Sequence, residues 1–339
     1  MHVFFTTVVR GASIEDGGEV VKLDWRQKSV IHRVPIVPSD PQIHDPNPRG
    51  SSRGGRGILA RGERLYVANY HSLLAFDFDL HYEGRITHNL LAGAHEVSQT
   101  EDLIWVAATS IDAALGLDET GTLCDSWWPR ENEFLQNYLS VEPLQIDKKV
   151  DNRLKFLEDK FLGKSHLHLN AIAFRDHHLY GLLNRYGIVY NATTDKIFIE
   201  DNALIGAHNL VFTEKFLLIN DTIGRKINIY AHDGEYVKQI DLLKFDKISD
   251  IYHSMGYESM KPTVLLSRLK QKLTGQKILS RPLFVRGLCT LDNSNQVLVG
   301  FSPATIVALD IETEQLLGLF QYSTDRTVCI HGLFAWHSG

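Results

Sequence analysis

The chain carries a short motif that recurs six times, and each of the first five copies is followed by the same succession of short apolar runs. In each motif a polar residue precedes a run of mainly apolar residues. Turns then separate further apolar runs, such as residues 65–69 and 216–221. Four short strands per unit are typical of a propeller blade, so the repeat predicts an all-β, six-bladed propeller. The motifs begin at Arg56, His95, Asn170, His208, Arg286 and His331.

The two ends of the chain each hold part of one further unit. Residues 1–35 contain three strand-like runs but lack the opening motif, whereas residues 331–336 supply an opening strand with nothing after it. Joining the two ends completes a blade. We therefore expect the C-terminal strand to close the N-terminal blade, and residues 1–339 to form a single domain.

Two of the intervals between motifs are nearly twice as long as the others. The motif starts are 39, 75, 38, 78 and 45 residues apart. The additional residues, about 129–166 and 242–284, show helical rather than alternating spacing of apolar residues. Both segments fall between the last strand of one blade and the first strand of the next. We expect two helical insertions that act as lids on the face where the innermost strands begin.

Composition narrows the function classes. The 339 residues are 44% hydrophobic, enough for a large core, and a formal charge of -6 gives no general case for nucleic-acid binding. We interpret the one basic run, residues 268–277, as a solvated helix face. No apolar run approaches the roughly 18 residues of a membrane span. Three cysteines without a CxxC motif, and a strand-like N-terminus, favour a cytoplasmic protein.

Three of the six motifs open with histidine, and these motifs alternate round the predicted ring. His95, His208 and His331 would therefore point at a common axis from three directions. Three neutral imidazoles leave coordination positions open for water or substrate, as in catalytic metal sites. The sequence thus predicts a divalent transition metal held by these three residues, with iron or copper favoured and zinc as the alternative.

The other ring positions suggest how a substrate is held. Arg56 and Arg286 flank His331 on either side, and a guanidinium next to a metal ion repels it unless an anion lies between them. This predicts a small anionic substrate gripped by the two arginines. Asn170 takes the remaining ring position.

A second layer of polar residues lies near the predicted ring. His168, two residues before Asn170, would lie on the same strand face and serve as a fourth ligand or a general base. The ends of the second strands reach the same face and include Asn184 and Asp221, with Tyr70 adjoining. We expect His168 or Asp221 to move protons, and Tyr70, Asn170 and Asn184 to contact substrate. The alternative for each strand-end residue is an ordinary turn.

The repeat, the shared terminal blade and the polar inner ring resemble the six-bladed propeller superfamily of the gluconolactonase and senescence-marker-protein enzymes. The resemblance covers nearly the whole chain and implies a divalent metal at the top of the channel. That family uses a glutamate, asparagines and an aspartate, and only Asn170 agrees here, which disfavours calcium. The histidine ring is similar in kind to that of the carotenoid-cleavage oxygenases, whose seven-bladed propellers hold iron on the axis with four histidines.

The sequence leaves three hypotheses for function. The first is an oxygen-using iron or copper enzyme, favoured slightly because the predicted ligands include no carboxylate. The second is a zinc-type hydrolase or lyase at the same site. The third is a scaffold propeller whose ring is a solvated channel lining and whose lids bind a partner protein.

Overall fold

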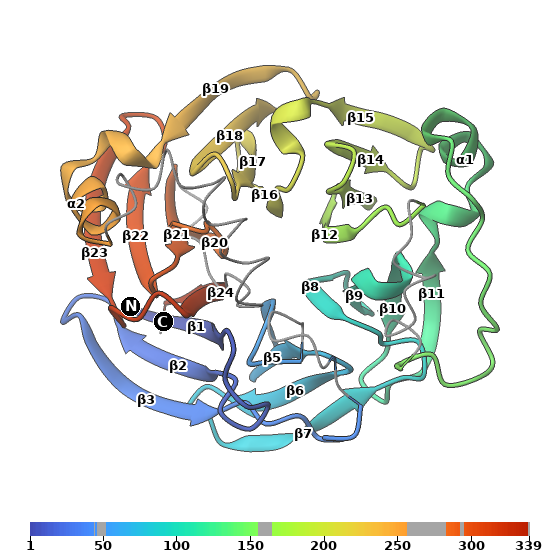
Figure 1. Ribbon diagram of the computed structural model, residues 1–339, viewed down its shortest axis with the longest axis horizontal. Coiled ribbons are helices and arrows are strands. Elements are labelled where there is room, and N and C mark those ends of the chain that lie inside the picture. The colour runs from blue at the N-terminus through green and yellow to red at the C-terminus, as the bar shows by residue number, and fades with distance from the viewer. Residues whose placement is uncertain (44, 46–51, 155–164, 256–282, 292–294, 338–339) are drawn as a thin grey trace, which may run out of the picture.

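Six four-stranded antiparallel sheets surround a central axis in the computed structural model of the chain (Figure 1). The structure describes residues 1–43, 45, 52–154, 165–255, 283–291 and 295–337. Each sheet runs outward from the axis, and its four strands follow one another in the sequence except in the blade that contains both termini. The predicted six-bladed propeller is confirmed.

Each blade is built of four strands that run in order from the axis outward. Blade 1 contains β24 (Val328–Trp336), β1 (His2–Val9), β2 (Glu19–Asp24) and β3 (Ser29–Pro35), and blade 2 contains β4 (Ile58–Arg61), β5 (Arg64–Asn69), β6 (Ser72–Asp77) and β7 (Tyr82–Thr87). Blade 3 contains β8 (Ala94–Gln99), β9 (Ile104–Ala108), β10 (Ala113–Leu117) and β11 (Leu123–Trp127), and blade 4 contains β12 (Leu169–Arg175), β13 (His178–Leu183), β14 (Ile188–Asn191) and β15 (Lys196–Glu200). Blade 5 contains β16 (His208–Phe212), β17 (Phe216–Asp221), β18 (Lys226–Ala231) and β19 (Tyr236–Asp241), and blade 6 contains β20 (Leu288–Leu291), β21 (Gln296–Phe301), β22 (Thr305–Asp310) and β23 (Gln315–Gln321).

Both ends of the chain meet in blade 1, as predicted. Strand β24 pairs antiparallel with β1, with His2 opposite Trp336 and Val9 opposite Val328. The core lies between neighbouring blades: Phe5 of blade 1 and Ile306 of blade 6, for example, belong to one buried cluster. Because each strand is covered on both faces by adjacent blades, the central strands consist largely of buried apolar residues.

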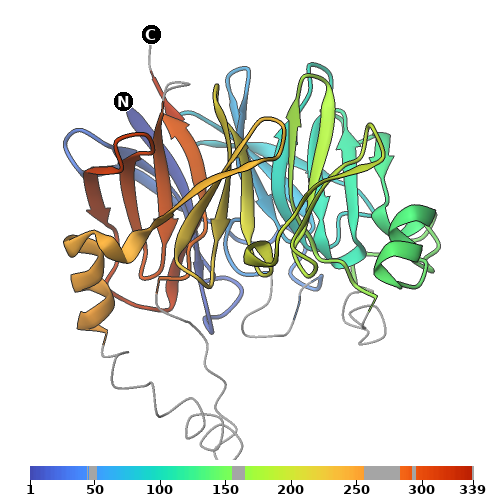
Figure 2. The ribbon, with the colours of Figure 1, turned by 90° about the horizontal axis from the view of Figure 1, so that it is seen from above.

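Two α-helices occur among the described residues, both in the predicted insertions. Helix α1 (Glu133–Leu139) begins where the side chain of Asn132 accepts a hydrogen bond from the Leu135 amide, and α2 (Asp246–Ser254) follows β19. Both helices lie at the rim (Figure 1), on the side of the disc away from the two termini (Figure 2). We call these two sides the insertion face and the terminal face.

The parts of the insertions that lie at residues 155–164 and 256–282, including the basic run 268–277, fall outside the described residues. Helices α1 and α2 themselves lie at the rim of the propeller and do not cover its axis, where the lids were expected (Figure 1). No helix in the described ranges has the length and apolar character needed to cross a bilayer.

Candidate metal centre

The three ring histidines converge on the axis. The ring centroid of His95 lies 4.6 Å from that of His331 and 5.4 Å from that of His208, and the third pair is separated by 6.4 Å. All three side chains are buried, with at most 5% of each residue exposed. Residues from three different blades are therefore brought into contact, as the repeat predicted.

A carboxylate that the sequence pattern did not predict joins the histidines. In a regular strand the residue after an axis-facing one points away from the axis. The pairing of β8 with β9 is irregular between Ala94 and Val97, where a bulge interrupts the alternation, and Glu96 turns inward next to His95. Similar irregularities follow His208 and precede Ala171, so the bulge recurs in three blades.

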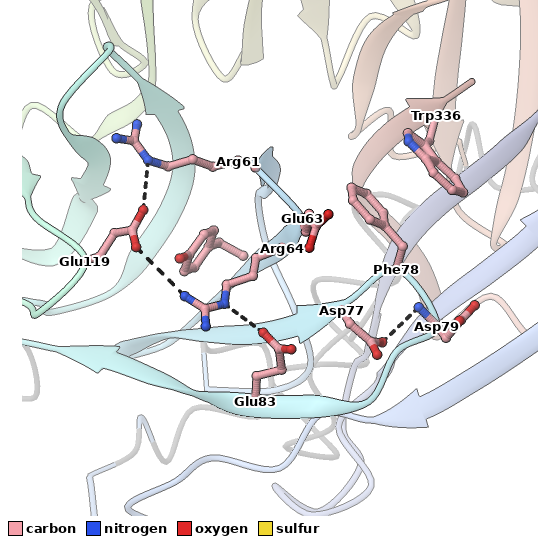
Figure 3. Close-up of a pocket in the computed structure, with 11 residues that line it drawn as sticks. Arg61, Glu63, Arg64, Asp77, Phe78, Asp79, Glu83, Glu119 and Trp336 are labelled. Atoms are coloured by element: carbon pink, nitrogen blue, oxygen red, sulfur yellow. Dashed lines mark hydrogen bonds and ion pairs between the residues drawn. The ribbon is translucent and has the colours of Figure 1, made fainter. Parts of the chain in front are cut away.

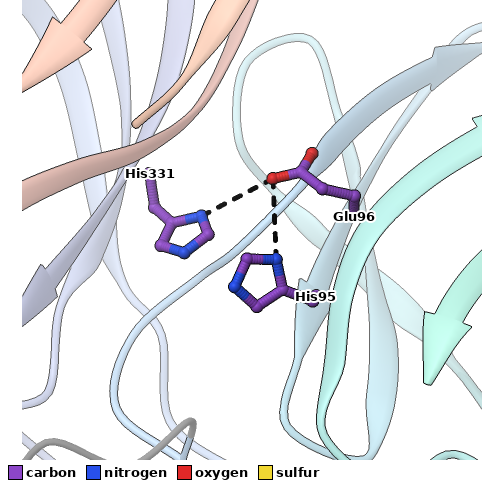
Figure 4. A group of neighbouring side chains, drawn as sticks. All are labelled: His95, Glu96 and His331. Carbon is purple, nitrogen blue, oxygen red and sulfur yellow. Dashed lines mark ion pairs between the residues drawn. The ribbon is translucent and has the colours of Figure 1, made fainter. Parts of the chain in front are cut away.

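The glutamate approaches two imidazoles at once (Figure 4). Its Oε1 atom lies 3.8 Å from Nδ1 of His95 and 3.8 Å from Nδ1 of His331. One ligand atom from each of the three residues lies within 4.8 Å of the others. Within the described residues neither Nδ1 atom has a hydrogen-bond partner, although both are buried. Such unpaired buried nitrogens are costly unless they bind something.

Asn209 holds Glu96 in place. Its Nδ2 donates to Oε1 of Glu96 at 3.0 Å, and its Oδ1 accepts from the Gly287 amide and from Nδ2 of Asn220, each also at 3.0 Å. The backbone amide of Gly287 can only donate, so it fixes which end of the Asn209 side chain faces the glutamate. Asn209 has a left-handed backbone with φ of 58°, which asparagine tolerates better than most residues.

Glycines in three other blades allow neighbouring inner strands to approach each other closely. The residue after the ring position is glycine in blades 1, 2 and 6. A Cβ atom on Gly332 would lie 2.3 Å from the carbonyl oxygen of Arg56, and one on Gly287, whose φ is 79°, would lie 2.9 Å from that of His331. The backbones of these inner strands therefore lie too close together to leave room for a side chain at this position.

Burial governs the protonation of the three histidines and of Glu96. It lowers the pKa of His95, His208 and His331 well below the usual range, and nearby arginines lower it further. Burial raises the pKa of Glu96 to about 8, although Arg286 and Arg56 oppose this shift. The imidazoles are therefore neutral at physiological pH, which is the form that binds metal ions.

His208 has one nitrogen available to a ligand. Its Nδ1 lies 2.7 Å from the hydroxyl of Thr222, which itself donates to the carbonyl of Val285 at 2.8 Å. The hydroxyl proton is thus used, so Nδ1 of His208 must donate and Nε2 keeps its lone pair. Among the described residues this buried Nε2 has no partner. A hydrogen bond that fixes the tautomer in this way is usual for metal-binding histidines.

Arg286 directly contacts one of the three histidines, His331. Its Nη1 lies 3.0 Å from Nε2 of His331, and its guanidinium stacks 4.5 Å from the ring centre of Phe284. Burial and the neighbouring charges of Arg10 and Arg56 lower its pKa, and burial lowers the pKa of Arg56 to about 9. Both guanidinium groups remain charged at neutral pH, so this region favours an anion.

His168 lies near the ring. Its ring centroid is 5.2 Å from that of His166, and it contributes to lowering the pKa of both His95 and His208. Burial lowers its own pKa to about 3. A neutral His168 can accept a hydrogen bond or bind a metal ion; its role stays a prediction.

Asn170 and Asn184 act on the same backbone group. The Nδ2 atoms of both side chains donate to the carbonyl of Ala207, the residue immediately before His208. They join blades 4 and 5 and thereby fix where His208 begins its strand. Contact of either residue with a substrate stays a prediction.

The described contacts of Tyr70 and Asp221 do not involve the three histidines. The fully buried hydroxyl of Tyr70 donates to the carbonyl of Arg153, in the first insertion. The carboxylate of Asp221 accepts a hydrogen bond of 2.7 Å from the Gly224 amide in the following turn. These contacts match ordinary turn and loop roles, and the functional roles of both residues remain predictions.

The axial channel continues from the ring toward the terminal face. A cavity of about 200 Å³ is lined by residues from all six innermost strands, including Ile58, Val97, Leu210 and Leu333, with Glu96 and Asn209 at its inner end. The lining residues follow the ring positions in each strand. The carboxylate of Glu96 is therefore reached from the terminal face, whereas Arg286 precedes its strand on the other side of the ring.

A larger groove of about 760 Å³ lies away from the axis (Figure 3). It is lined by none of the predicted site residues. Its two arginines are already paired, Arg61 with Glu119 at 3.3 Å and Arg64 with Glu83 at 2.7 Å. The groove thus lacks the unpaired buried nitrogens that distinguish the axial site.

Comparison with known proteins identifies the fold. No protein-family model matches the chain, and no curated protein matches its sequence. A protein of unknown function from Bacteroides caccae is similar in structure with a TM-score of 0.57 and 8% identity, over 98% of this chain and 97% of that one. Streptogramin B lyase is similar with a TM-score of 0.51 and 10% identity, over 97% and 91%. Since 1127 solved chains resemble this one, these likenesses support the propeller fold alone.

Proposed function

We propose that the protein is a metal-dependent enzyme whose divalent ion is held by His95, Glu96 and His331 on the propeller axis. The observation that carries this proposal is the pair of buried Nδ1 atoms without a hydrogen-bond partner in the described part of the chain, each 3.8 Å from the same carboxylate oxygen. Ligand atoms around a four-coordinate ion with bonds of roughly 2.1 Å lie about 3.4 Å apart. Small side-chain rotations would bring the three residues to that spacing.

The donor set narrows the choice of metal. Two histidines and one carboxylate form the ligand set of non-haem iron(II) oxygenases and also of zinc hydrolases. The carboxylate makes copper less suitable than the sequence alone suggested. His208, with its Nε2 lone pair directed by Thr222, is the fourth residue able to bind the ion or to accept a proton from a ligand.

We propose oxidation by an iron(II) oxygenase as the reaction class and zinc-dependent hydrolysis or elimination as the alternative. A bound ion would supply Lewis acidity, and iron would add redox chemistry. The residues of the chain would orient a small anionic substrate. Arg286 and Arg56 would hold its negative charge, and Asn209 would keep Glu96 aligned.

Elemental analysis of untagged protein tests the proposal. Protein produced with iron and zinc in the medium is expected to contain about one equivalent of metal. His95→Ala and His331→Ala should lose it while retaining the circular-dichroism spectrum of a folded propeller. His81→Ala is the matched control, since His81 is 77% exposed at the rim. Its metal content should equal that of the unaltered protein.

The scaffold hypothesis predicts a different outcome. If the ring were only a channel lining, the unaltered protein would bind no metal after anaerobic reconstitution with iron(II) or zinc, and the histidine changes would alter stability alone. That result would overturn the enzyme proposal. Iron uptake with oxygen consumption would favour the oxygenase, whereas zinc uptake without it would favour the hydrolase or lyase.

A further inference from the structure

We propose that metal and anion binding are coupled in this protein, because Arg286 can hydrogen-bond to His331 only while no metal occupies Nδ1 of that ring. This inference rests on the proposed function, since it concerns the same metal ion. It adds a second ligand, an oxyanion such as a carboxylate or sulfate, and a reason why the two ligands bind together.

The coupling follows from the two nitrogens of His331. A neutral imidazole has one N–H group and one lone pair. Arg286 only donates hydrogen bonds, and its Nη1 is 3.0 Å from Nε2, so the lone pair lies on Nε2 and the proton on Nδ1. A metal ion at Nδ1 needs the lone pair there. The proton must then be on Nε2, where it faces the guanidinium donor, and the hydrogen bond is lost.

The surroundings determine what Arg286 then does. Its guanidinium lies 4.5 Å from the ring centre of Phe284, and that of Arg10 lies 5.4 Å from the same ring. The Nε atom of Arg286 is buried and has no partner among the described residues. Once released from His331, Nη1 joins Nε as a donor without a partner among the described residues, close to the proposed divalent cation. An oxyanion between the two would neutralise both charges.

Because the coupling between two bound ligands is reciprocal, the effect of the anion on metal affinity can be measured. If metal binding releases the anion-binding group, the anion must strengthen metal binding by the same factor. Couplings of this kind are typically about 5- to 150-fold, and we expect roughly tenfold here. The metal-free protein should correspondingly bind the anion weakly, because Arg286 is then engaged with His331.

The first test measures the zinc dissociation constant by chelator competition, in sulfate and in perchlorate at equal ionic strength. Sulfate should lower the constant about tenfold in the unaltered protein. Arg286→Met should remove the difference between the two salts. Arg61→Met, a matched change in the rim groove, should preserve it. Zinc uptake without a sulfate effect, or a sulfate effect that persists in Arg286→Met, would overturn the coupling but leave the proposed function intact.

The second test observes the tautomer directly. In metal-free protein labelled with ¹⁵N-histidine, His331 should carry its proton on Nδ1, and zinc should move it to Nε2. Assignment uses the resonance lost in His331→Asn. A metal-free protein with the proton on Nε2 would refute the contact on which the proposal depends. Failure of the unaltered protein to take up zinc would overturn both proposals.

Discussion

The two sides of the histidine ring differ in charge and in available partners. Toward the insertion face lie guanidinium groups, with Arg286 bonded to Nε2 of His331. Toward the terminal face lies Glu96, the carboxylate that approaches Nδ1 of the same ring. One imidazole thus separates positively charged guanidinium groups from the carboxyl group of Glu96. The proposed cation site therefore lies on one side of the ring and the proposed anion site on the other.

Removing the carboxylate should have the largest effect. Glu96→Ala deletes one of the three proposed ligands, and we expect metal affinity to fall by more than about 100-fold, beyond the loss typical of a residue that only supports a ligand. Chelator competition measures the constant. Glu63→Ala, in the rim groove, should leave it unchanged. Near-normal affinity in Glu96→Ala would show that the cation does not bind on the terminal side of the ring.

Releasing the carboxylate from its partner should have a smaller effect. Asn209→Gly keeps the left-handed backbone but removes the hydrogen bond to Glu96, and we expect a loss of about 10- to 100-fold in metal affinity. Asp176→Gly makes the same kind of change at an exposed left-handed position and should have no effect. Equal affinities in the two variants would mean that Asn209 serves the fold alone.

Removing the arginine on the positive side of the ring should raise metal affinity rather than lower it. In perchlorate, Arg286→Met should strengthen zinc binding, by about tenfold, because it removes a neighbouring positive charge and the hydrogen bond that competes for His331. Isothermal titration of metal-free protein measures this change. Weaker binding would indicate that Arg286 supports the metal site rather than opposing it.

The last prediction concerns stability and pH rather than metal affinity. The folded protein raises the pKa of Glu96 to about 8, so between its ordinary pKa of 4.5 and pH 8 the native state holds a proton that the unfolded chain releases. The stabilising contribution of this proton is complete below pH 4.5 and is lost as the pH rises through 8. Glu96→Gln should therefore gain stability relative to the unaltered protein as the pH rises.

Urea unfolding at about pH 5 and about pH 8, with a chelator present, measures this difference. We expect the ratio of the two unfolding constants to change by roughly tenfold or more between these pH values. A pH-independent difference would mean that Glu96 is ionised in the metal-free native state.

The sequence predicted the blades and the ring because both depend on regular periodicity. The alternation of apolar residues within each strand, and the recurrence of the same motif in every unit, identify which residue of each inner strand faces the axis. Glu96 was missed because the same alternation places it facing away from the axis, and a bulge after Ala94 reverses that. One signal was present in the chain: the glycines that follow Arg56, Arg286 and His331 mark a position where only a few side chains fit.

The roles of the amide side chains could not be predicted from the sequence. Asn170 and Asn184 share the carbonyl of Ala207, and Asn209 bridges Glu96 to the backbone of blade 6. These bonds depend on how closely neighbouring blades approach each other. That distance cannot be read from composition or from spacing along the chain.

The strand that completes blade 1 also delivers His331, so the site requires a closed propeller. His95 lies two blades away, and separating β24 from β1 would remove His331 from the proposed ligand set. Any ion bound there opposes separation of the two chain ends, by an amount that grows with the logarithm of its free concentration. The proposed centre would therefore make the closure of the propeller, and its resistance to unfolding from the chain ends, depend on the supply of metal.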